Sequence, residues 1–326
     1  VALDLAVRGL KTGDYEAAIA GGVDCNLMPG TLLAFKRLGL ISDGECRVFD
    51  HQAKGYVMSE GAAVLALTTL GYARRHDLPV LAEISAMGFD ASAPAHLLSP
   101  SPEAYSEAMR RCYRQVPVHP ADVAHLDVFG VANPFFDALE AHAAAQVFPR
   151  PVGFGNIKTE FGYFKAANPA VVLAKLTLMA SRRRLLPFFG YRPETTILEK
   201  DAVLAARRRI EEVPGGRPIH LAADVNGIGG NHGHVLVSTL PAHLAPAAQP
   251  VDLISAGAWR PAENGLVVLF SGQGAQYPGM MAEIYSSRSE VRAVMDRGEA
   301  IFKARCGRSL LEMMFDAQGA EALNRT

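Results

Sequence analysis

The segments FGVANPFFD (residues 129–137) and GNIKTEFGYFKAA (residues 155–167) decide the fold of this chain. The first segment continues from residues 125–130, an apolar run that is typical of a short buried strand entering a loop. The second is followed by a strongly apolar helical stretch over residues 169–181, in which Pro169 suits the first turn. Each segment is therefore expected to be a loop next to a buried element.

The remainder of residues 1–240 extends this pattern. Residues 1–18 have apolar positions at helical spacing, and the apolar strand Ala17–Ala20 is expected to end at Gly21 and Gly22. A helix that leads into a strand ending in glycines belongs to a layered α/β protein. Further expected elements are a turn-rich segment (39–50), a glycine-rich loop entering a buried strand (54–67), an amphipathic helix (102–115), a charged helix (198–212) and a strand–turn–strand unit (220–240).

A change in composition marks a domain boundary near residue 262. Residues 241–262 are rich in Ala and Pro and have little periodicity, which is typical of a linker, and Trp259 is expected to anchor it on a domain surface. LVVLF (266–270) then begins a new buried strand, and SGQGAQYPGMM opens a new unit. The chain begins without Met inside a helical pattern, so we expect it to be an internal piece of a longer polypeptide.

Charge and cysteine content exclude several classes of protein. The 326 residues are 49% hydrophobic and carry a formal net charge of −1, which argues against nucleic acid or an anionic membrane as the main partner. Arg182–Arg184 is the sizeable basic cluster, and we interpret it as the solvated end of a helix. No CxxC pair indicates a disulfide framework or a zinc site, and a reducing cytoplasm fits. The four cysteines are Cys25, Cys46, Cys112 and Cys306. No membrane span or signal peptide is predicted.

Residues 1–240 resemble the later part of a β-ketoacyl synthase, a condensing enzyme of the thiolase fold. The resemblance rests on landmarks that occur in the family's order. They are AAIAGGVD, GLISDGECRVFD (with Asp43, Gly44, Cys46, Phe49 and Asp50), GYVMSEGAAVL, LDVFGVANPFFDALE (with Gly130, Pro134, Asp137 and Glu140), NIKTEFGYFKAA (with Lys158, Gly162 and Ala166) and VNGIGGNHGHV (with Gly227, Gly229, Gly230, His234 and Val235). The resemblance implies an α/β fold of five layers, α-β-α-β-α, which is partial at the N-terminus.

Residues 266–281, LVVLFSGQGAQYPGMM, resemble the opening strand and loop of malonyl-type acyltransferases. In that family the glutamine at Gln273 helps to form the oxyanion hole, and the serine nucleophile would lie beyond Thr326. A condensing domain, a linker and an acyltransferase follow one another in multifunctional polyketide and fatty-acid synthases. The order here is similar to that of polyunsaturated fatty-acid synthases, in which a chain-length-factor-like domain pairs with an active ketosynthase.

The two resemblances divide the chain into four parts. Residues 1–81 would be the remainder of the N-terminal ketosynthase half, and residues 82–240 the C-terminal half. Residues 241–262 would be the linker, and residues 263–326 the beginning of the acyltransferase domain.

The positions of the family's two catalytic histidines read Phe129 and Tyr163 in this sequence. The histidines assist decarboxylation of the malonyl group and stabilise the developing enolate. Phe129 has no polar atom, and Tyr163 keeps a hydroxyl donor that is not basic at pH 7. General acid–base assistance alone is typically worth about 10²–10⁴-fold, so both replacements together should remove most of the rate. We expect the two positions to lie in one pocket, because the family brings them together from separate loops.

The resemblance also bears on positions outside this pair. The family's cysteine nucleophile would lie upstream of Val1, so its identity is open. Lys158 matches the family lysine near the second histidine, and we interpret it as a structural ion pair with a buried carboxylate, Glu140 being the candidate. The resemblance implies that Ile228, Gly229 and Gly230 belong to a loop next to the acyl chain, with Ile228 at the position of the family's usual gatekeeping Phe. The remaining expectations are that Cys25 is a small core residue, that His232 and His234 share a strand face without binding metal, and that Phe135–Phe136 and Phe188–Phe189 are core or dimer contacts.

Three hypotheses follow. In the first, the chain is a non-catalytic condensing partner that dimerises with an active ketosynthase or a second copy, shapes the acyl tunnel and positions an acyl carrier protein. In the second, it is an atypical condensing or decarboxylating enzyme with Tyr163 as the donor. In the third, it is a scaffold that docks the acyltransferase. The acyl chains would arrive as phosphopantetheine thioesters on the carrier protein, and neither a cofactor nor a metal is expected. Whether this copy is an enzyme stays open, although its parent polypeptide would be of the acyltransferase class.

Overall fold

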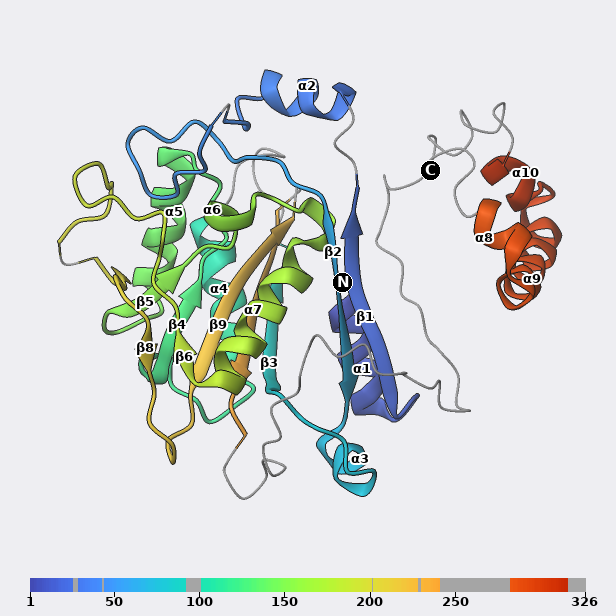
Figure 1. Cartoon of the computed structure of the whole chain (residues 1–326), viewed down its shortest axis with the longest axis horizontal. Helices are drawn as coiled ribbons and strands as arrows, with labels where there is room; N and C mark the ends of the chain where they lie inside the picture. Colours follow the sequence, from blue (N-terminus) through green and yellow to red (C-terminus); the bar gives the residue numbers. More distant parts are fainter. Residues whose placement is uncertain are drawn as a thin grey trace. The chain divides into compact units, whose positions relative to one another are not determined.

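Six strands form the main sheet of the computed structural model, which describes residues 1–25, 29–42, 44–91, 101–200, 202–227, 230–240 and 282–315. The strand order is β3-β10-β9-β4-β5-β7 (Figure 1). β9, β4, β5 and β7 are parallel neighbours, whereas β10 pairs antiparallel with both β9 and β3. The strands are β3 (Glu83–Asp90), β4 (Val123–Asp127), β5 (Val152–Gly155), β7 (Leu204–Ala206), β9 (His220–Gly227) and β10 (Asn231–Ser238).

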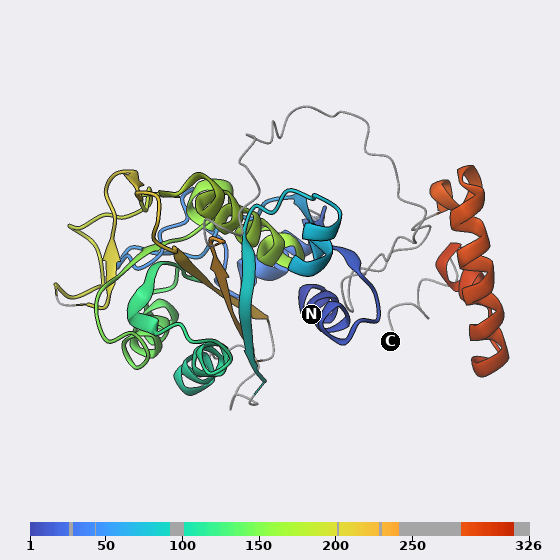
Figure 2. The same cartoon turned by 90° about the horizontal axis from the view of Figure 1, so that it is seen from below.

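Helices cover both faces of this sheet. α4 (Pro102–Tyr113) and α5 (Pro134–Ala145) lie on one face, and α7 (Asn168–Arg182) lies on the other (Figure 2). α4 and α7 are the helices expected over 102–115 and 169–181, and both begin with a proline in the first turn. The sequence therefore predicts α4 and α7 correctly.

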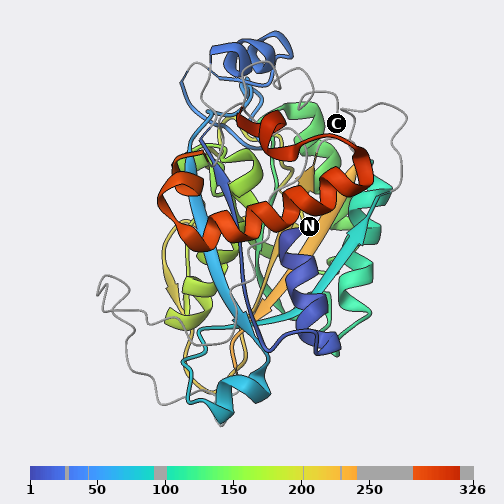
Figure 3. The same cartoon turned by 90° about the vertical axis from the view of Figure 1, so that its right-hand side faces the viewer.

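A second sheet lies beyond α7. β1 (Ala17–Asp24) pairs antiparallel with β2 (Gly61–Thr68), and the two strands run side by side next to α1 (Ala2–Thr12) in Figure 3. Ala18 and Ala20 pack against α1, and Gly22 lies against Ala166 and Ala167, just before α7. The described residues of the first unit thus form a helix–sheet–helix–sheet stack, with α1 and α7 in the layer between the sheets.

Two local predictions were wrong. β1 does not end at Gly21 but continues through both glycines to Asp24. A Cβ at position 22 would lie 2.6 Å from the carbonyl oxygen of Ala166, so glycine permits a close backbone approach here. Residues 198–212 are not a helix but contain β7 and β8 (Glu211–Glu212). The composition of residues 198–212 favours a helix, but residues 204–206 pair with β5 as strand β7, and this pairing outweighs the local preference.

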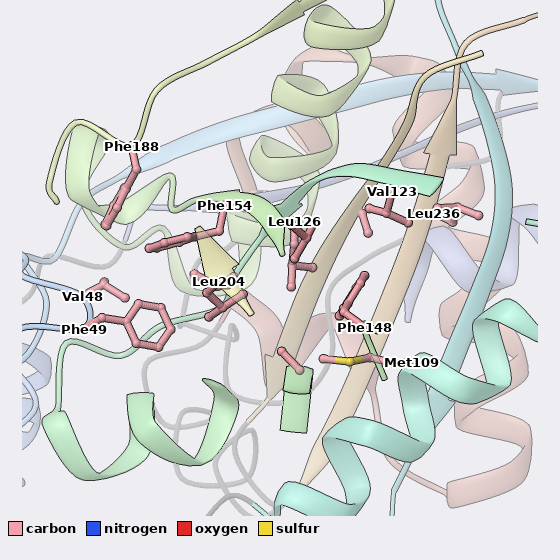
Figure 4. Close-up of a cluster of buried hydrophobic side chains, with 14 of the residues drawn as sticks. Val48, Phe49, Met109, Val123, Leu126, Phe148, Phe154, Phe188, Leu204 and Leu236 are labelled. Carbon is pink, nitrogen blue, oxygen red and sulfur yellow. The ribbon is translucent and has the colours of Figure 1, made fainter. Parts of the chain in front are cut away.

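The main hydrophobic core lies between the six-stranded sheet and α4 and α5. Aromatic side chains contribute much of it: Phe49 meets Phe154 edge-on, with ring centroids 5.4 Å apart, and Phe154 contacts Phe188 at 4.9 Å (Figure 4). Burial of such rings is a large source of stability and fixes the loops that lead into them. Phe188 is therefore a core residue, as expected, whereas Phe189 is 65% exposed.

Shorter elements complete the first unit, Val1–Leu269. They are α2 (Pro29–Arg37), α3 (Leu70–Arg75), η1 (Pro120–Asp122), α6 (Lys158–Phe161), η2 (Lys165–Ala167) and β6 (Arg184–Leu185), which pairs with β8. The second unit, Phe270–Thr326, contains α8 (Ala282–Ser287), α9 (Ser289–Cys306) and α10 (Leu310–Phe315) in its described part. The linker, the strand predicted over 266–270 and Gln273 lie outside the described residues.

Candidate functional site

The loop that carries Phe129 follows β4 and is held by its backbone. Glu140 of α5 accepts hydrogen bonds from the N–H groups of Phe129 (2.6 Å) and Gly130 (2.8 Å). Asp137, one turn earlier on α5, accepts from Val131 (2.9 Å) and Phe49 (2.9 Å). Both carboxyl groups are fully buried, so this hydrogen bonding is what makes their burial tolerable.

The loop that carries Tyr163 follows α6 and pairs with the segment before β2. The Tyr163 N–H donates to the carbonyl of Val57 (2.7 Å), and the Ser59 N–H donates to the carbonyl of Tyr163 (3.0 Å). Gly162, with φ +82°, makes the turn, and a Cβ there would lie 2.9 Å from the side chain of Ser59. Glycine is required at this position because of both its conformation and its surroundings.

The two loops bring Phe129 and Tyr163 together, as expected. Their rings meet edge-on, with centroids 6.1 Å apart and planes at 89°. Tyr56 adds a third ring, 4.5 Å from Tyr163. The place where the resemblance implies two imidazoles therefore holds an aromatic cluster of Phe129, Tyr163 and Tyr56.

Lys158 is enclosed by this cluster and is 1% exposed. Its Nζ lies 3.7 Å from the ring centroid of Phe129 and 5.2 Å from that of Tyr163, within the range of cation–π attraction. Nζ also donates to the carbonyls of Phe129 and, at 3.2 Å, Gly130. The Asn156 side chain donates to the carbonyls of Val128 and Phe129, both at 2.8 Å, so the two loops are tied together.

The predicted ion pair between Lys158 and Glu140 was wrong. Within the described ranges, Lys158 has no carboxylate within 4 Å. The Glu140 oxygens instead accept backbone N–H groups, and the lysine faces carbonyl oxygens and ring faces. Buried backbone N–H and C=O groups need hydrogen-bond partners. The N–H groups of Phe129 and Gly130 bond to Glu140, and the carbonyls of the same two residues bond to Lys158, so neither side chain pairs with the other.

Burial shifts the acid–base behaviour of the whole cluster. It lowers the pKa of Lys158 to about 8 and, together with the negative charge of Asp224, raises the pKa of Glu140 to about 8. Burial also raises the pKa of Asp137 to about 6. The pKa of Tyr163 rises to about 12 through burial and the nearby Asp24. At neutral pH the Tyr163 hydroxyl therefore stays protonated, and the amine of Lys158 is the basic group closest to the two aromatic rings.

A second buried group is linked to this site and was not predicted from the sequence as a unit. His234 of β10 lies 2.7 Å, Nδ1 to Oδ1, from Asp224 of β9, and its Nε2 lies 2.9 Å from the hydroxyl of Tyr113. His234 and Asp224 are direct cross-strand neighbours in the β9–β10 register. The strand–turn–strand pattern over 220–240 was the signal that could have identified this pair.

A third buried group lies at the end of β4. Asp127 accepts a hydrogen bond from Lys175 of α7 at 2.6 Å, and Nε2 of His125 lies 3.7 Å from the same carboxyl oxygen. Burial alone would raise the pKa of Asp127, but Lys175 and His125 outweigh it and hold that pKa well below its usual range. This group joins β4 to α7 beneath the Phe129 loop, and nothing in the sequence pattern had indicated it.

Other predicted positions divide into described and undescribed ones. Gly230 begins the return into β10 with φ +79°, whereas Ile228 and Gly229 lie outside the described residues. Cys25 is exposed after the end of β1, so its prediction as a core residue was wrong. Strand β1 ends at Asp24, and the chain leaves the sheet there.

The histidines of β10 do share a strand face, as expected. His232 and His234 are both buried, and they lie opposite Asn226 and Asp224 of β9. No group of three His, Cys, Asp or Glu residues in the described ranges has the arrangement of a metal site. None of the helices that the structure describes is both long and apolar enough to cross a membrane.

Models of one protein family match most of the first unit. The model "Beta-ketoacyl synthase, N-terminal domain" matches residues 1–73, and "Beta-ketoacyl synthase, C-terminal domain" matches residues 81–192. Among curated relatives, the highly reducing polyketide synthase poxF of Penicillium oxalicum is 32% identical over 256 residues, 75% of this chain and 10% of that protein. The erythronolide synthase EryA3 of Saccharopolyspora erythraea is 27% identical over 349 residues, 99% of this chain and 11% of that protein. The chain thus spans about a tenth of these relatives.

Solved structures share its fold. The ketosynthase from module 6 of the bacillaene synthase of Bacillus subtilis 168 superposes with a TM-score of 0.69 at 23% identity, over 73% of this chain and 45% of that one. The ishigamide ketosynthase/chain length factor superposes with a TM-score of 0.66 at 20% identity, over 73% of this chain and 58% of that one. These likenesses confirm the predicted thiolase-like α/β fold.

Proposed function

This chain belongs to the β-ketoacyl synthase family, and from that premise we propose that it is a ketosynthase-like domain that does not itself catalyse condensation. The observation that carries the proposal is the enclosure of Lys158 by the Phe129 and Tyr163 rings. Condensation by decarboxylation needs donors aimed at an oxygen that becomes negatively charged. At these two positions the chain offers a ring without polar atoms and a hydroxyl whose pKa is raised to about 12.

The domain's role in the proposal is structural and depends on a partner. It would pair with an active ketosynthase, contribute one wall of the acyl tunnel and help to position the acyl carrier protein. Its likeness to the fold of a ketosynthase/chain length factor supports such a pairing. A further solved relative, titled as an acyl-carrier protein in complex with its ketosynthase, supports a carrier protein as a partner.

The region after the linker is proposed as the start of a malonyl-type acyltransferase. The motif SGQGAQYPGMM, with Gln273 as an oxyanion-hole residue, carries this proposal. The alignment with erythronolide synthase EryA3 covers 99% of the chain and so extends through this region, which supports it. Loading of malonyl or acyl groups would belong to that domain.

One observation favours the alternative that this copy is an enzyme. The pKa of Lys158, lowered to about 8 by burial, leaves a fraction of the amine neutral near pH 7.5, and a neutral amine can accept a proton. The Tyr163 hydroxyl would then be the donor. This alternative requires substrate to reach Nζ, which is now covered by two carbonyls and two rings.

The deciding experiment uses the full-length polypeptide with its carrier protein and its candidate ketosynthase partner. Malonyl-thioester decarboxylation and condensation are followed in wild type, Phe129→Ala and Tyr163→Ala. Phe135→Ala is the matched control, because Phe135 is 63% exposed on α5. We expect turnover within about twofold of wild type in all three variants and complete dependence on the partner's own cysteine. A large loss of turnover in Tyr163→Ala, with the complex still assembled, would show that this copy performs chemistry.

A further inference from the structure

A cavity of about 610 Å³ lies at the C-terminal ends of α4 and α5. The two helices pack against each other, and the segments that follow them supply most of the lining. The cavity shares no residue with the aromatic cluster of Phe129, Tyr163 and Tyr56. Its volume is within the range of small-molecule sites, about 300–1,000 Å³, so we asked which ligand its lining would select.

One part of the lining is aliphatic. Val116, Val118 and Val147 line the cavity, and all three are partly buried against the main hydrophobic core. We call these three residues the valine wall. Pro117 and Pro120 also line the cavity, and each proline ring fixes φ and so restricts the backbone of this loop. An apolar group that binds here therefore meets a surface that is already in place.

Tyr113 forms the buried side of the same cavity. Its hydroxyl lies 2.9 Å from Nε2 of His234, and its ring meets Phe148 edge-on, with centroids 6.1 Å apart. A hydrogen bond to the sheet and an aromatic contact after α5 thus hold this side chain in one position. The buried side of the cavity is preorganised, which lowers the cost of binding a ligand.

Arg110 gives the cavity a positive charge that its surroundings do not balance. Nη1 donates to the hydroxyl of Ser106 at 3.1 Å, and Nη2 lies 3.5 Å from Oε1 of Gln146, so both partners are neutral. Among the residues that the structure describes, no carboxylate lies within 4 Å of Arg110, and neither Asp nor Glu lines the cavity. Glu107 of the same helix pairs instead with Arg114, at 2.6 Å. The charge of Arg110 therefore favours an anionic ligand.

We propose that this cavity binds an amphipathic monocarboxylate, with its carboxylate on Arg110 and its aliphatic chain on the valine wall. Arginine suits a carboxylate because its planar fork offers two parallel N–H donors. The valine wall favours a carboxylate with an aliphatic chain over inorganic phosphate, because burial of apolar surface adds to binding. A single unbalanced arginine does not suit a nucleic acid, whose binding depends on several phosphate contacts. This inference goes beyond the proposed function and does not depend on it.

The test titrates the full-length polypeptide with octanoate and follows hydrogen exchange of residues 113–119 and 146–148. This local measurement reports the cavity separately from any other site in the polypeptide. We expect octanoate to slow exchange in these residues. Binding should tighten about threefold for each methylene added from hexanoate to octanoate, because each one buries further apolar surface on the valine wall.

Two variants separate the charge from the apolar wall. Arg110→Gln should weaken octanoate binding at least about tenfold, because it removes the charged partner of the carboxylate. Arg74→Gln is the matched control, since it removes the same charge from an exposed residue of α3, and it should change binding less than about twofold. Val147→Ser keeps the charge and should lower the gain in affinity per methylene, because it makes the valine wall smaller.

Three outcomes would overturn the proposal. They are exchange in these residues that millimolar octanoate leaves unchanged, equal weakening of binding in Arg110→Gln and Arg74→Gln, and equal protection by 1-octanol or by inorganic phosphate. The last outcome would mean that apolar contact alone, or charge alone, is recognised. Hydrogen exchange in β9 verifies that the variants are folded. The non-catalytic role is judged separately by the Tyr163→Ala turnover assay, which leaves this cavity unchanged, so either idea can fail alone.

Discussion

Lys158 and His234 are both buried, but their surroundings differ in kind. The two ring nitrogens of His234 meet the side chains of Asp224 and Tyr113, which the β9–β10 register and α4 bring into place. Lys158 meets two carbonyls and two aromatic rings contributed by separate loops, without a carboxylate within 4 Å among the described residues. Cross-strand register therefore gives His234 side-chain partners, whereas Lys158, at the start of α6, is enclosed by the backbone of one loop and by aromatic rings.

The largest expected effect lies on the sheet side. Asp224→Ala should reduce the stability of the unit by about 3 kcal/mol, because it leaves Nδ1 of His234 buried without a partner. Hydrogen exchange of β9 and β10 in the full-length protein measures the loss, and Asp14→Ala, at an exposed residue after α1, is the control. Equal exchange in the two variants would show that the histidine does not depend on this carboxylate.

The next effect lies on the loop side. Phe129→Ala should cost about 2 kcal/mol, because it removes the ring beneath the Lys158 ammonium and its contact with Tyr163. Hydrogen-exchange rates of the amides in residues 128–133 and 156–163 measure this loss of stability. Phe135→Ala should change them little, since that ring is mostly exposed. A cost for Phe129→Ala no greater than for Phe135→Ala would mean that the rings do not hold the lysine.

A pH dependence connects the two regions through Glu140. Its folded pKa, raised to about 8 by burial and Asp224, exceeds its ordinary 4.5, so the folded state binds more protons than the unfolded state between these values. This contribution to stability is complete below about pH 4.5 and is lost as pH rises through 8. Glu140→Gln should therefore reduce, by about 1 kcal/mol per pH unit, the decline in the free energy of unfolding that urea denaturation measures between pH 5.5 and 8. An unchanged decline in Glu140→Gln would assign it to another group.

Tyr163→Phe should have the smallest effect. The Tyr163 hydroxyl has no hydrogen bond to any residue in the described part of the chain, and its ring contacts remain in phenylalanine. We expect a change in stability below about 0.5 kcal/mol. A cost above about 1 kcal/mol, measured by the same exchange experiment, would indicate a hydroxyl partner and would strengthen the case for Tyr163 as a donor.

The sequence predicted the features that depend on the periodicity of apolar residues or on the order of the family's landmarks along the chain. The apolar helix over 169–181, the strand–turn–strand unit and the approach of Phe129 to Tyr163 follow from periodicity and from the family's order of landmarks. It did not predict which oxygen would pair with which donor. Glu140 was assigned to Lys158, but two backbone N–H groups reach it, and no periodic pattern encodes such contacts between loops. The helix predicted over residues 198–212 was wrong for a related reason. Pairing of β7 with β5 is a contact between distant segments, and it outweighs the local helix propensity.

The hydrogen bonds that hold residues 129–131 have a consequence for substitutions at position 129. Glu140 and Asp137 grip the peptide N–H groups, and none of these bonds involves the side chain at position 129. The path of the chain through residues 129–131 therefore does not depend on which side chain stands at position 129. A substitution there can change the chemistry of the side chain without removing these hydrogen bonds. The change Phe129→His would install an imidazole on a backbone already shaped to present it.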